Sequence, residues 1–216
     1  VDPDYIASRS ALIDPASTIA DPQPGTPPGA TMALADGDEP VEHGTTHFSV
    51  VDGDGNAISY TSTIEGAFGS GLHWRGFYLN NELTDFSLSP EVDGKPVANR
   101  VEGGKRPRSS MAPTIVFDAD GEVVLVIGAA GGPTIPVQVA RSIIGVVDFG
   151  LSAEQALALP FTMAFGPTVI AEENTRLDVE LPVTAIGKDY LENAIERTPS
   201  DTGYQFNVGG VLGASL

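Results

Sequence analysis

A glycine–threonine pair, Gly44-Thr45, stands where a proline-rich acidic segment gives way to a strand-like run. Glycine tolerates unusual backbone angles, so the peptide bond before Thr45 can be strained and its carbonyl attacked by the neighbouring hydroxyl. Passage through an ester would cut the chain between Gly44 and Thr45 and leave a free amine on the threonine. An N-terminal threonine carries its own base, because an α-amine with a pKa of about 7.7–8.0 can take the hydroxyl proton near neutral pH. The pair is common before strands, so by itself it is a weak indication.

Other candidate sites are weaker still. The stretch 52–56 (DGDGN) resembles the start of a calcium loop, but the sixth and twelfth positions hold Ala57 and Thr63 instead of glycine and glutamate. A hairpin turn is the better interpretation. The Gly69-Ser70-Gly71 stretch has no lysine and no strand–turn–helix context, so it is a poor phosphate site. The three histidines lack metal-ligand spacing, and we expect them to be structural or exposed: His43, His47 and His73.

The elements that must position the threonine follow from hydropathy patterns. Two hairpins are expected, one from strands at 47–52 and 57–64, the other from strands at 114–117 and 122–127. The last of these is apolar almost throughout, which is typical of a strand covered on both faces. Between the hairpins lies a long connection, about 66–111.

Helical periodicity follows the strands. Val139, Ile143, Val146 and Val147 fall on one face of a predicted helix that stops before Gly150. Ser152 and Gln155 predict a capping box for a helix through Leu159. A short helix at 189–197 and a strand at 203–208 are also expected. Strands followed by helices indicate a layered α+β domain.

Residues 1–44 differ from the rest, because prolines and acidic residues favour an extended tail, mobile from about 22 to 42. The chain starts at Val1 without a signal peptide, so we expect a processed product, a fragment or part of a longer chain. Its 11 basic and 29 acidic residues give a formal net charge of −18, which argues against nucleic acid and anionic membrane as partners. It has no cysteine, which excludes disulfides and thiolate metal sites, and no apolar run long enough to span a bilayer.

Four segments occur in one order and at plausible spacings: 45–52 (TTHFSVVD), 80–86 (NNELTDF), 105–111 (KRPRSSM) and 128–132 (GAAGG). Together they resemble the small catalytic subunit of the γ-glutamyltransferases (γ-glutamyltranspeptidases, glutathione hydrolases), from about residue 45 to 152 and more weakly to 160. The resemblance implies an N-terminal-nucleophile hydrolase with an αββα sandwich, partial here without the large subunit. Residues 1–44 would be the end of that subunit and the linker before the cut, and residues 45–216 the small subunit.

The resemblance also implies a role for each matched residue. Thr45 would be the nucleophile that self-cleavage after Gly44 exposes, and Thr63 would hydrogen-bond it. Three acids would hold the ammonium of the substrate: Glu65, Glu82 and Asp85. Two serines would bind its α-carboxylate, Ser109 and Ser110, and two backbone N–H groups would form the oxyanion hole, those of Gly131 and Gly132.

The implied reaction transfers a γ-glutamyl group from glutathione or a related donor to Thr45, then to water or to an amino-acid or peptide amine. It needs no metal or organic cofactor, takes place beside a large subunit from the same precursor, and by analogy with bacterial relatives is periplasmic or secreted. The large-subunit arginine of the family is absent, and Arg106 and Arg108 lie in the wrong place to replace it. The stretch 88–104, where some members carry a lid, has no aromatic residue, so we expect an open pocket.

Two alternatives stay open. A glutaryl-type β-lactam acylase would share the fold, although Asp85 argues against it because its substrate lacks the ammonium. A catalytically inactive remnant that acts by binding would keep the fold without cleaving its chain.

Overall fold

The computed structural model describes residues 2–14, 16–17, 19, 22–30, 34–37, 44–165 and 168–172. The helix expected at 189–197, the strand expected at 203–208, His43 and much of the expected mobile tail lie outside these residues. The helices are α1 (Pro3–Ser10), α2 (Ile135–Val147) and α3 (Ala153–Leu157), with two 3-10 turns, η1 (Glu82–Asp85) and η2 (Gly132–Thr134). The strands are β1 (Thr46–Val51), β2 (Ala57–Ser62), β3 (His73–Trp74), β4 (Phe77–Tyr78), β5 (Glu91–Val92), β6 (Lys95–Pro96), β7 (Thr114–Phe117), β8 (Val123–Ile127), β9 (Thr162–Phe165) and β10 (Thr168–Ala171).

The first predicted hairpin is β1 with β2, which pair antiparallel from Thr46 opposite Ser62 to Val51 opposite Ala57. Both strands end earlier than expected, at residues 51 and 62. The Asp52 carboxylate closes the turn, because it accepts hydrogen bonds from the N–H groups of Asp54 and Asn56, each at 2.9 Å. The stretch 52–56 is therefore a hairpin turn, as predicted.

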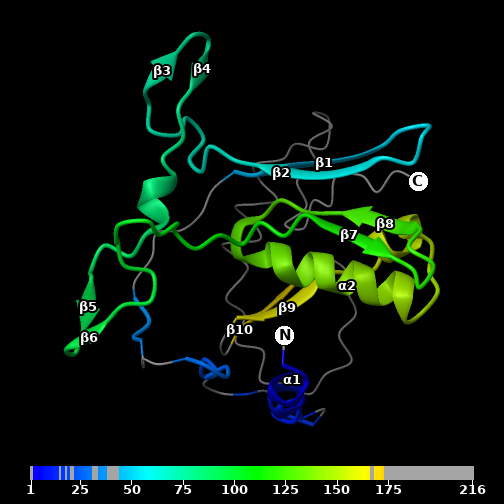
Figure 1. The fold of residues 1–216 in the computed structure, drawn as a ribbon, viewed down its shortest axis with the longest axis horizontal. Coiled ribbons are helices and arrows are strands. Elements are labelled where there is room, and N and C mark those ends of the chain that lie inside the picture. Colours follow the sequence, from blue (N-terminus) through cyan, green and yellow to red (C-terminus); the bar gives the residue numbers. More distant parts are fainter. Residues whose placement is uncertain are drawn as a thin grey trace.

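The second predicted hairpin is β7 with β8, whose pairing shifts register between Val116 and Phe117. The last three residues of β8, Leu125 to Ile127, are at most 3% exposed, which confirms a strand covered on both faces. One cover is the β1–β2 hairpin, which lies on β7–β8 in Figure 1. The hydroxyls of Ser49 and Ser59 donate across this interface to the carbonyls of Val126 (3.2 Å) and Ile127 (2.8 Å).

The other cover is α2, which packs on the opposite face of β7–β8 (Figure 1). The predicted apolar face of the helix is correct for Val139, Ile143 and Val146, and wrong for Val147, which is 57% exposed. At 100° per residue, Val147 lies roughly 80° around the helix from Val139, outside the packed stripe. The buried core joins the two elements through Leu125, Ile127, Ala129, Ile135 and Val139.

The capping box before α3 is present, with Ser152 and Gln155 bonded reciprocally at 3.1 and 2.9 Å. The helix ends at Leu157, two residues short of the predicted end. β1–β2, β7–β8 and the helices α2 and α3 thus form successive layers, a sheet–sheet–helix order that is part of the predicted αββα sandwich.

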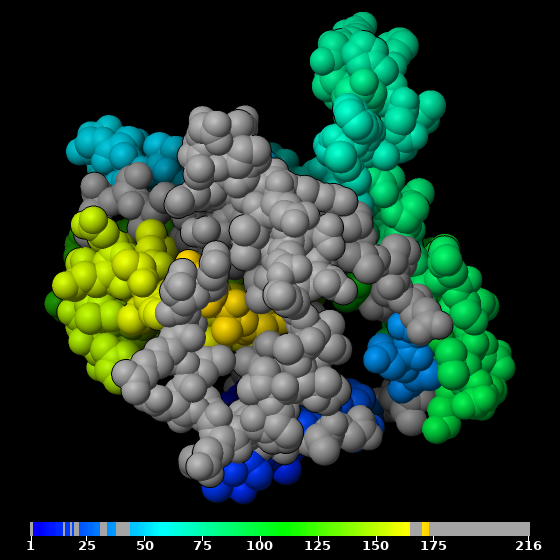
Figure 2. All heavy atoms as spheres, turned by 180° about the vertical axis from the view of Figure 1, so that it is seen from behind, coloured from blue at the N-terminus to red at the C-terminus, as the bar shows by residue number. Residues whose placement is uncertain are grey.

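Two regions hold more structure than the sequence predicted. The expected extended tail contains α1, because Asp2 caps the N–H of Tyr5 at 2.8 Å and Pro3 occupies the first turn, where a missing N–H costs nothing. The connection 66–111 holds the short hairpins β3–β4 and β5–β6, which extend away from the layers in Figure 1. Figure 2, the view from behind, also shows the β3–β4 hairpin projecting from the rest of the molecule.

Candidate active site

A small cavity of about 20 Å³ lies where the open end of the β1–β2 hairpin meets η1 and the segment before β7. Eight of the ten predicted site residues line it, although the segments that carry them are far apart in sequence. The lining residues are Gly44, Thr45, Thr63, Glu65, Glu82, Asp85, Ser109, Ser110, Met111 and Ile135. The acids and hydroxyls expected to hold a substrate are therefore gathered around the predicted nucleophile.

The register of the β1–β2 hairpin brings Thr45 and Thr63 together. Thr46 pairs with Ser62 at the open end, so Thr45 and Thr63 occupy the next opposed positions. Side chains alternate along a strand, which puts both threonines on the face that carries His47 and is turned toward β8.

In the intact chain, the Thr63 hydroxyl donates a hydrogen bond to the carbonyl oxygen of Gly44 and accepts one from the N–H of Glu65 at 2.8 Å. The Gly44 carbonyl belongs to the bond that self-cleavage would break, so Thr63 polarises the carbon that Thr45 would attack. Gly44 has a φ of 83°, and a Cβ there would lie 3.3 Å from the carbonyl oxygen of Glu65, so glycine suits this position. The expected bond from Thr63 to Thr45 itself stays a prediction.

Three carboxylates enter the cavity from two turns. Glu65 is buried and has a φ of 69°, which is unusual for a residue other than glycine. Asn81 holds the Glu65 turn, because its amide donates to Glu65 Oε2 at 3.3 Å and accepts from the N–H of Gly66 at 2.8 Å. Glu82 and Asp85 stand at the two ends of η1, directly after Asn81. One asparagine therefore ties together the two turns that carry the acids.

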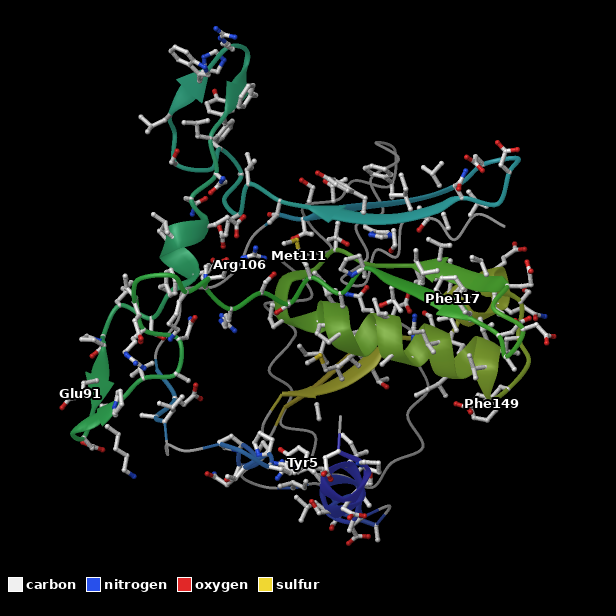
Figure 3. All side chains as sticks on the ribbon, in the orientation of Figure 1. Tyr5, Glu91, Arg106, Met111, Phe117 and Phe149 are labelled. Carbon is white, nitrogen blue, oxygen red and sulfur yellow. The ribbon has the colours of Figure 1, made fainter. Side chains whose placement is uncertain are left out.

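A second asparagine, Asn99, ties η1 to the serine pair. Its amide donates to the carbonyl of Asp85 at 2.6 Å and accepts from the N–H of Arg108 at 2.9 Å, just before Ser109. Figure 3 labels Arg106 and Met111 at either end of this serine segment, which runs from η1 toward β7. None of the residues 88–104, all of which the structure describes, lines the cavity. The open pocket expected from this stretch stays a prediction.

Gly131 and Gly132 are not among the described residues that line the cavity. They lie between β8 and α2, with φ values of 129° and 54°, in conformations that favour glycine. Ile135, at the start of α2 and three residues after Gly132, does line the cavity. The oxyanion-hole role of the two glycines remains a prediction.

His47 is a structural residue, as expected. Its ring is 2% exposed and lies within 2.8 Å of Thr61 Oγ1 and 3.1 Å of Ser49 Oγ. Burial lowers the pKa of His47 below its usual 6.5. His73 is exposed on β3. Within the described ranges there is no group of three or more histidine, cysteine or acidic residues that could hold a metal ion.

A family model described as Gamma-glutamyltranspeptidase matches residues 1–201 of the chain. The chain belongs to this family. It is 42% identical over 164 residues to the glutathione hydrolase proenzyme of Pseudomonas aeruginosa, a match that covers 73% of this chain and 27% of that protein. It thus spans about a quarter of the length of this curated relative.

Solved structures agree on the fold. The T380A mutant of Helicobacter pylori γ-glutamyltranspeptidase superposes with a TM-score of 0.55 at 35% identity, over 68% of this chain and 80% of that one. The cephalosporin acylase of Bacillus halodurans gives a TM-score of 0.52 at 29% identity, over 61% and 24% of the two chains. The predicted α+β, N-terminal-nucleophile fold of the family is therefore confirmed. No helix in the described part of the chain is long and apolar enough to cross a membrane.

Several residues that build the site have no role predicted from the sequence. Asn81 was inside a matched segment and could have been noticed there, whereas Asn99 lies in the stretch considered only as a lid. Gln138 and Thr134, which hold the glycine pair from α2 and η2, carry no local signal.

Proposed function

We propose that this chain is the catalytic part of a self-cleaving threonine acyltransferase or hydrolase that breaks γ-glutamyl amide bonds. The observation that carries the proposal is the Thr63 hydrogen bond to the Gly44 carbonyl, beside Thr45 and inside a cavity lined by three carboxylates. In this proposal the same group of residues first catalyses cleavage of the chain before Thr45 and then catalyses acyl transfer to Thr45.

In the first stage, the Thr45 hydroxyl oxygen attacks the carbonyl carbon of Gly44 while Thr63 stabilises the developing oxyanion. The C–N bond breaks, the Thr45 amine takes the proton, and Gly44 is held as an ester on the Thr45 oxygen. Water hydrolyses this ester, which leaves a carboxylate on Gly44 and a free amine on Thr45. Gly44 lines the cavity in the intact chain, so its departure opens room for a donor.

In the second stage, the free amine takes the Thr45 hydroxyl proton as the oxygen attacks the γ-carbonyl of a donor such as glutathione. Glu65, Glu82 and Asp85 hold the ammonium of the donor, because a buried cation needs charged partners. The hydroxyls of two neighbouring serines hold the α-carboxylate, and two backbone N–H groups stabilise the oxyanion; these are Ser109, Ser110, Gly131 and Gly132. The amine product leaves, and water or an acceptor amine takes the γ-glutamyl group from Thr45. No cofactor enters either stage.

The active protein also needs a large subunit. Relatives such as the Pseudomonas aeruginosa protein are proenzymes, and this chain covers 27% of that protein's length. We propose that the missing part of the fold and the cationic partner for the α-carboxylate come from a large subunit of the same precursor. By analogy with bacterial relatives, we also propose that the protein is periplasmic or secreted. Cell fractionation tests this location.

The deciding experiment uses the protein together with its large subunit. Mass spectrometry should find a fragment that starts at Thr45, and the protein should release the amine from a γ-glutamyl anilide. Thr45→Ala should abolish both processes, and Thr46→Ala, one residue along on the exposed face, should leave both largely intact. Anilide release by Thr45→Ala at the normal rate would contradict the assignment of the nucleophile.

The likeness to a cephalosporin acylase makes a glutaryl amide the informative second substrate. Faster release from the glutaryl amide than from the γ-glutamyl anilide would favour an acylase. An uncleaved chain that releases neither would favour the inactive alternative.

A further inference from the structure

Gln138 is a fully buried polar residue on the face of α2 that meets the end of β8, with an exposed fraction of 0%. Its side-chain nitrogen donates two hydrogen bonds, to the carbonyl oxygen of Ala130 at 3.1 Å and to the hydroxyl of Thr134 at 2.7 Å. Ala130 precedes the glycine pair 131–132 and Thr134 follows it. One amide therefore holds both sides of the glycine turn.

Thr134 extends this network to Gly131. The Thr134 hydroxyl has a single proton, which it donates to the carbonyl oxygen of Gly131 at 2.8 Å, so it accepts from Gln138. The orientation of the Gln138 amide is set by Ala130, because the opposite orientation would bring the amide oxygen against a carbonyl oxygen. The order of donation runs from Gln138 to Thr134 to Gly131.

The space next to Gly131 is occupied by the same two side chains. A Cβ on Gly131 would lie 2.7 Å from Thr134 Oγ1 and 2.9 Å from Gln138 Nε2. Gly131 also has a φ of 129°, which L side chains rarely adopt. Only glycine at position 131 leaves room for the Gln138 amide and the Thr134 hydroxyl.

A planar trans peptide points its C=O and its N–H in opposite directions. Gln138 holds the carbonyl of Ala130, so the N–H of Gly131 in the same peptide group points away from Gln138. Thr134 holds the carbonyl of Gly131, so the N–H of Gly132 points away from Thr134. These are the two N–H groups proposed above to stabilise the oxyanion. The side chains that fix the two carbonyls therefore also fix the direction of the two donors.

We propose that Gln138 is a positioning residue for the oxyanion hole, acting through Ala130 and Thr134 on the N–H groups of Gly131 and Gly132. The inference rests on the proposed function. Gln138 touches no reacting atom. Its role is to orient these two N–H groups before the substrate binds.

The test uses two variants in the protein with its large subunit. Gln138→Met keeps an unbranched side chain and removes the donor, and Gln138→Glu keeps the shape but removes the NH2 group, whose two donated hydrogen bonds a carboxyl group cannot both replace. Ser142→Ala is the matched control, because Ser142 lies one turn along α2, is 1% exposed, and donates to the Gln138 main-chain carbonyl without touching the glycine turn. Single-turnover acylation by a γ-glutamyl anilide is measured for each, together with inhibition by glutamate and by a boronic acid analogue that becomes tetrahedral on Thr45.

Loss of a single oxyanion donor costs about 10²–10³ in rate, so misplacing the pair should slow acylation by roughly 10–100-fold in both Gln138 variants. Inhibition by the boronic acid should weaken by a similar factor, since it resembles the transition state, while glutamate binding should stay within about twofold. Ser142→Ala should behave like the unaltered protein.

Acylation within about threefold of normal in both Gln138 variants would overturn the inference, as would a parallel loss of glutamate binding or an equal loss in Ser142→Ala. Failure of the unaltered protein to release the anilide would instead contradict the proposed function. Should Gln138→Met not fold, Gln138→Glu alone carries the comparison, with its thermal unfolding recorded beside that of Ser142→Ala.

Discussion

The imidazole ring of His47 lies directly on the main chain of Gly128. A Cβ atom built on that glycine would lie 2.3 Å from both Nδ1 and Cε1 of the ring. His47, on β1, is two residues after Thr45, and Gly128 directly follows β8, three residues before Gly131. The contact therefore sets the distance between β1, which follows the proposed nucleophile directly, and the turn that carries the proposed oxyanion donors.

Gly128→Ala should destabilise the protein, because the new methyl group meets a ring that is buried and hydrogen-bonded on both nitrogens. Overpacking of this kind costs about 1–3 kcal/mol. Urea unfolding measures the change. Gly103→Ala is the control, since a Cβ there meets no atom within 4 Å, and its effect should stay within about 0.5 kcal/mol. Equal unfolding midpoints for the two variants would show that the ring and β8 separate freely.

His47 should make stability depend on pH in a defined direction. Burial lowers its folded-state pKa below 6.5, so the unfolded chain binds the proton first as the pH falls. The stability that the neutral ring contributes is fully present above pH 6.5 and is lost as the pH falls through the folded pKa. His47→Gln has no ring to protonate, so its free energy of unfolding does not fall in this way. The difference in free energy of unfolding between this variant and the unaltered protein should therefore shrink from pH 7.5 to pH 5, as measured by urea unfolding. A constant difference between His47→Gln and the unaltered protein over this pH range would contradict the burial argument.

Thr63→Ala should slow self-cleavage, because the Gly44 carbonyl loses the hydroxyl that polarises it. The expected loss is about 10²–10³ in rate, the usual effect of removing one oxyanion donor. Mass spectrometry over time follows the fragment that begins at Thr45. Thr63→Ser keeps the hydroxyl and should cleave at close to the normal rate, as should Ser62→Ala at the adjacent exposed position. Equal rates for the alanine and serine variants at position 63 would remove Thr63 from the cleavage step.

Asp85→Asn should weaken binding of a γ-glutamyl donor, because the donor's ammonium loses a buried anionic partner. A charge-assisted hydrogen bond is worth about 1.5–3 kcal/mol, which corresponds to a rise in KM of roughly 10–100-fold. The exposed Glu91→Gln on β5 is the control for a change of charge alone. A glutaryl amide, which has no ammonium, should be affected much less by Asp85→Asn. Equal effects on both substrates would place Asp85 outside the ammonium site.

An element could be predicted from the sequence when its hydropathy pattern repeats over enough residues. The hairpins around residues 52–56 and 118–121 and the helix α2 were predictable, because strand alternation or helical periodicity extends over several residues. The strands β3 to β6 have two residues each, too few for alternation to show. The helix α1 was hidden by the proline content of its segment, although Pro3 stands in the one turn of a helix that accepts proline.

The amino-acid sequence by itself determined which residues could carry the chemistry, since Thr45, Asp85 and the serine pair stand in short segments whose residue types are informative locally. Only the tertiary structure decided that Thr63 faces the Gly44 carbonyl and that Gln138 holds the glycine turn. Those hydrogen bonds depend on strand register and on how a helix packs against a sheet, and both are settled by contacts between distant segments. A local pattern carries no information about which distant group a buried side chain will meet, so the supporting residues of the site emerged only from the folded chain.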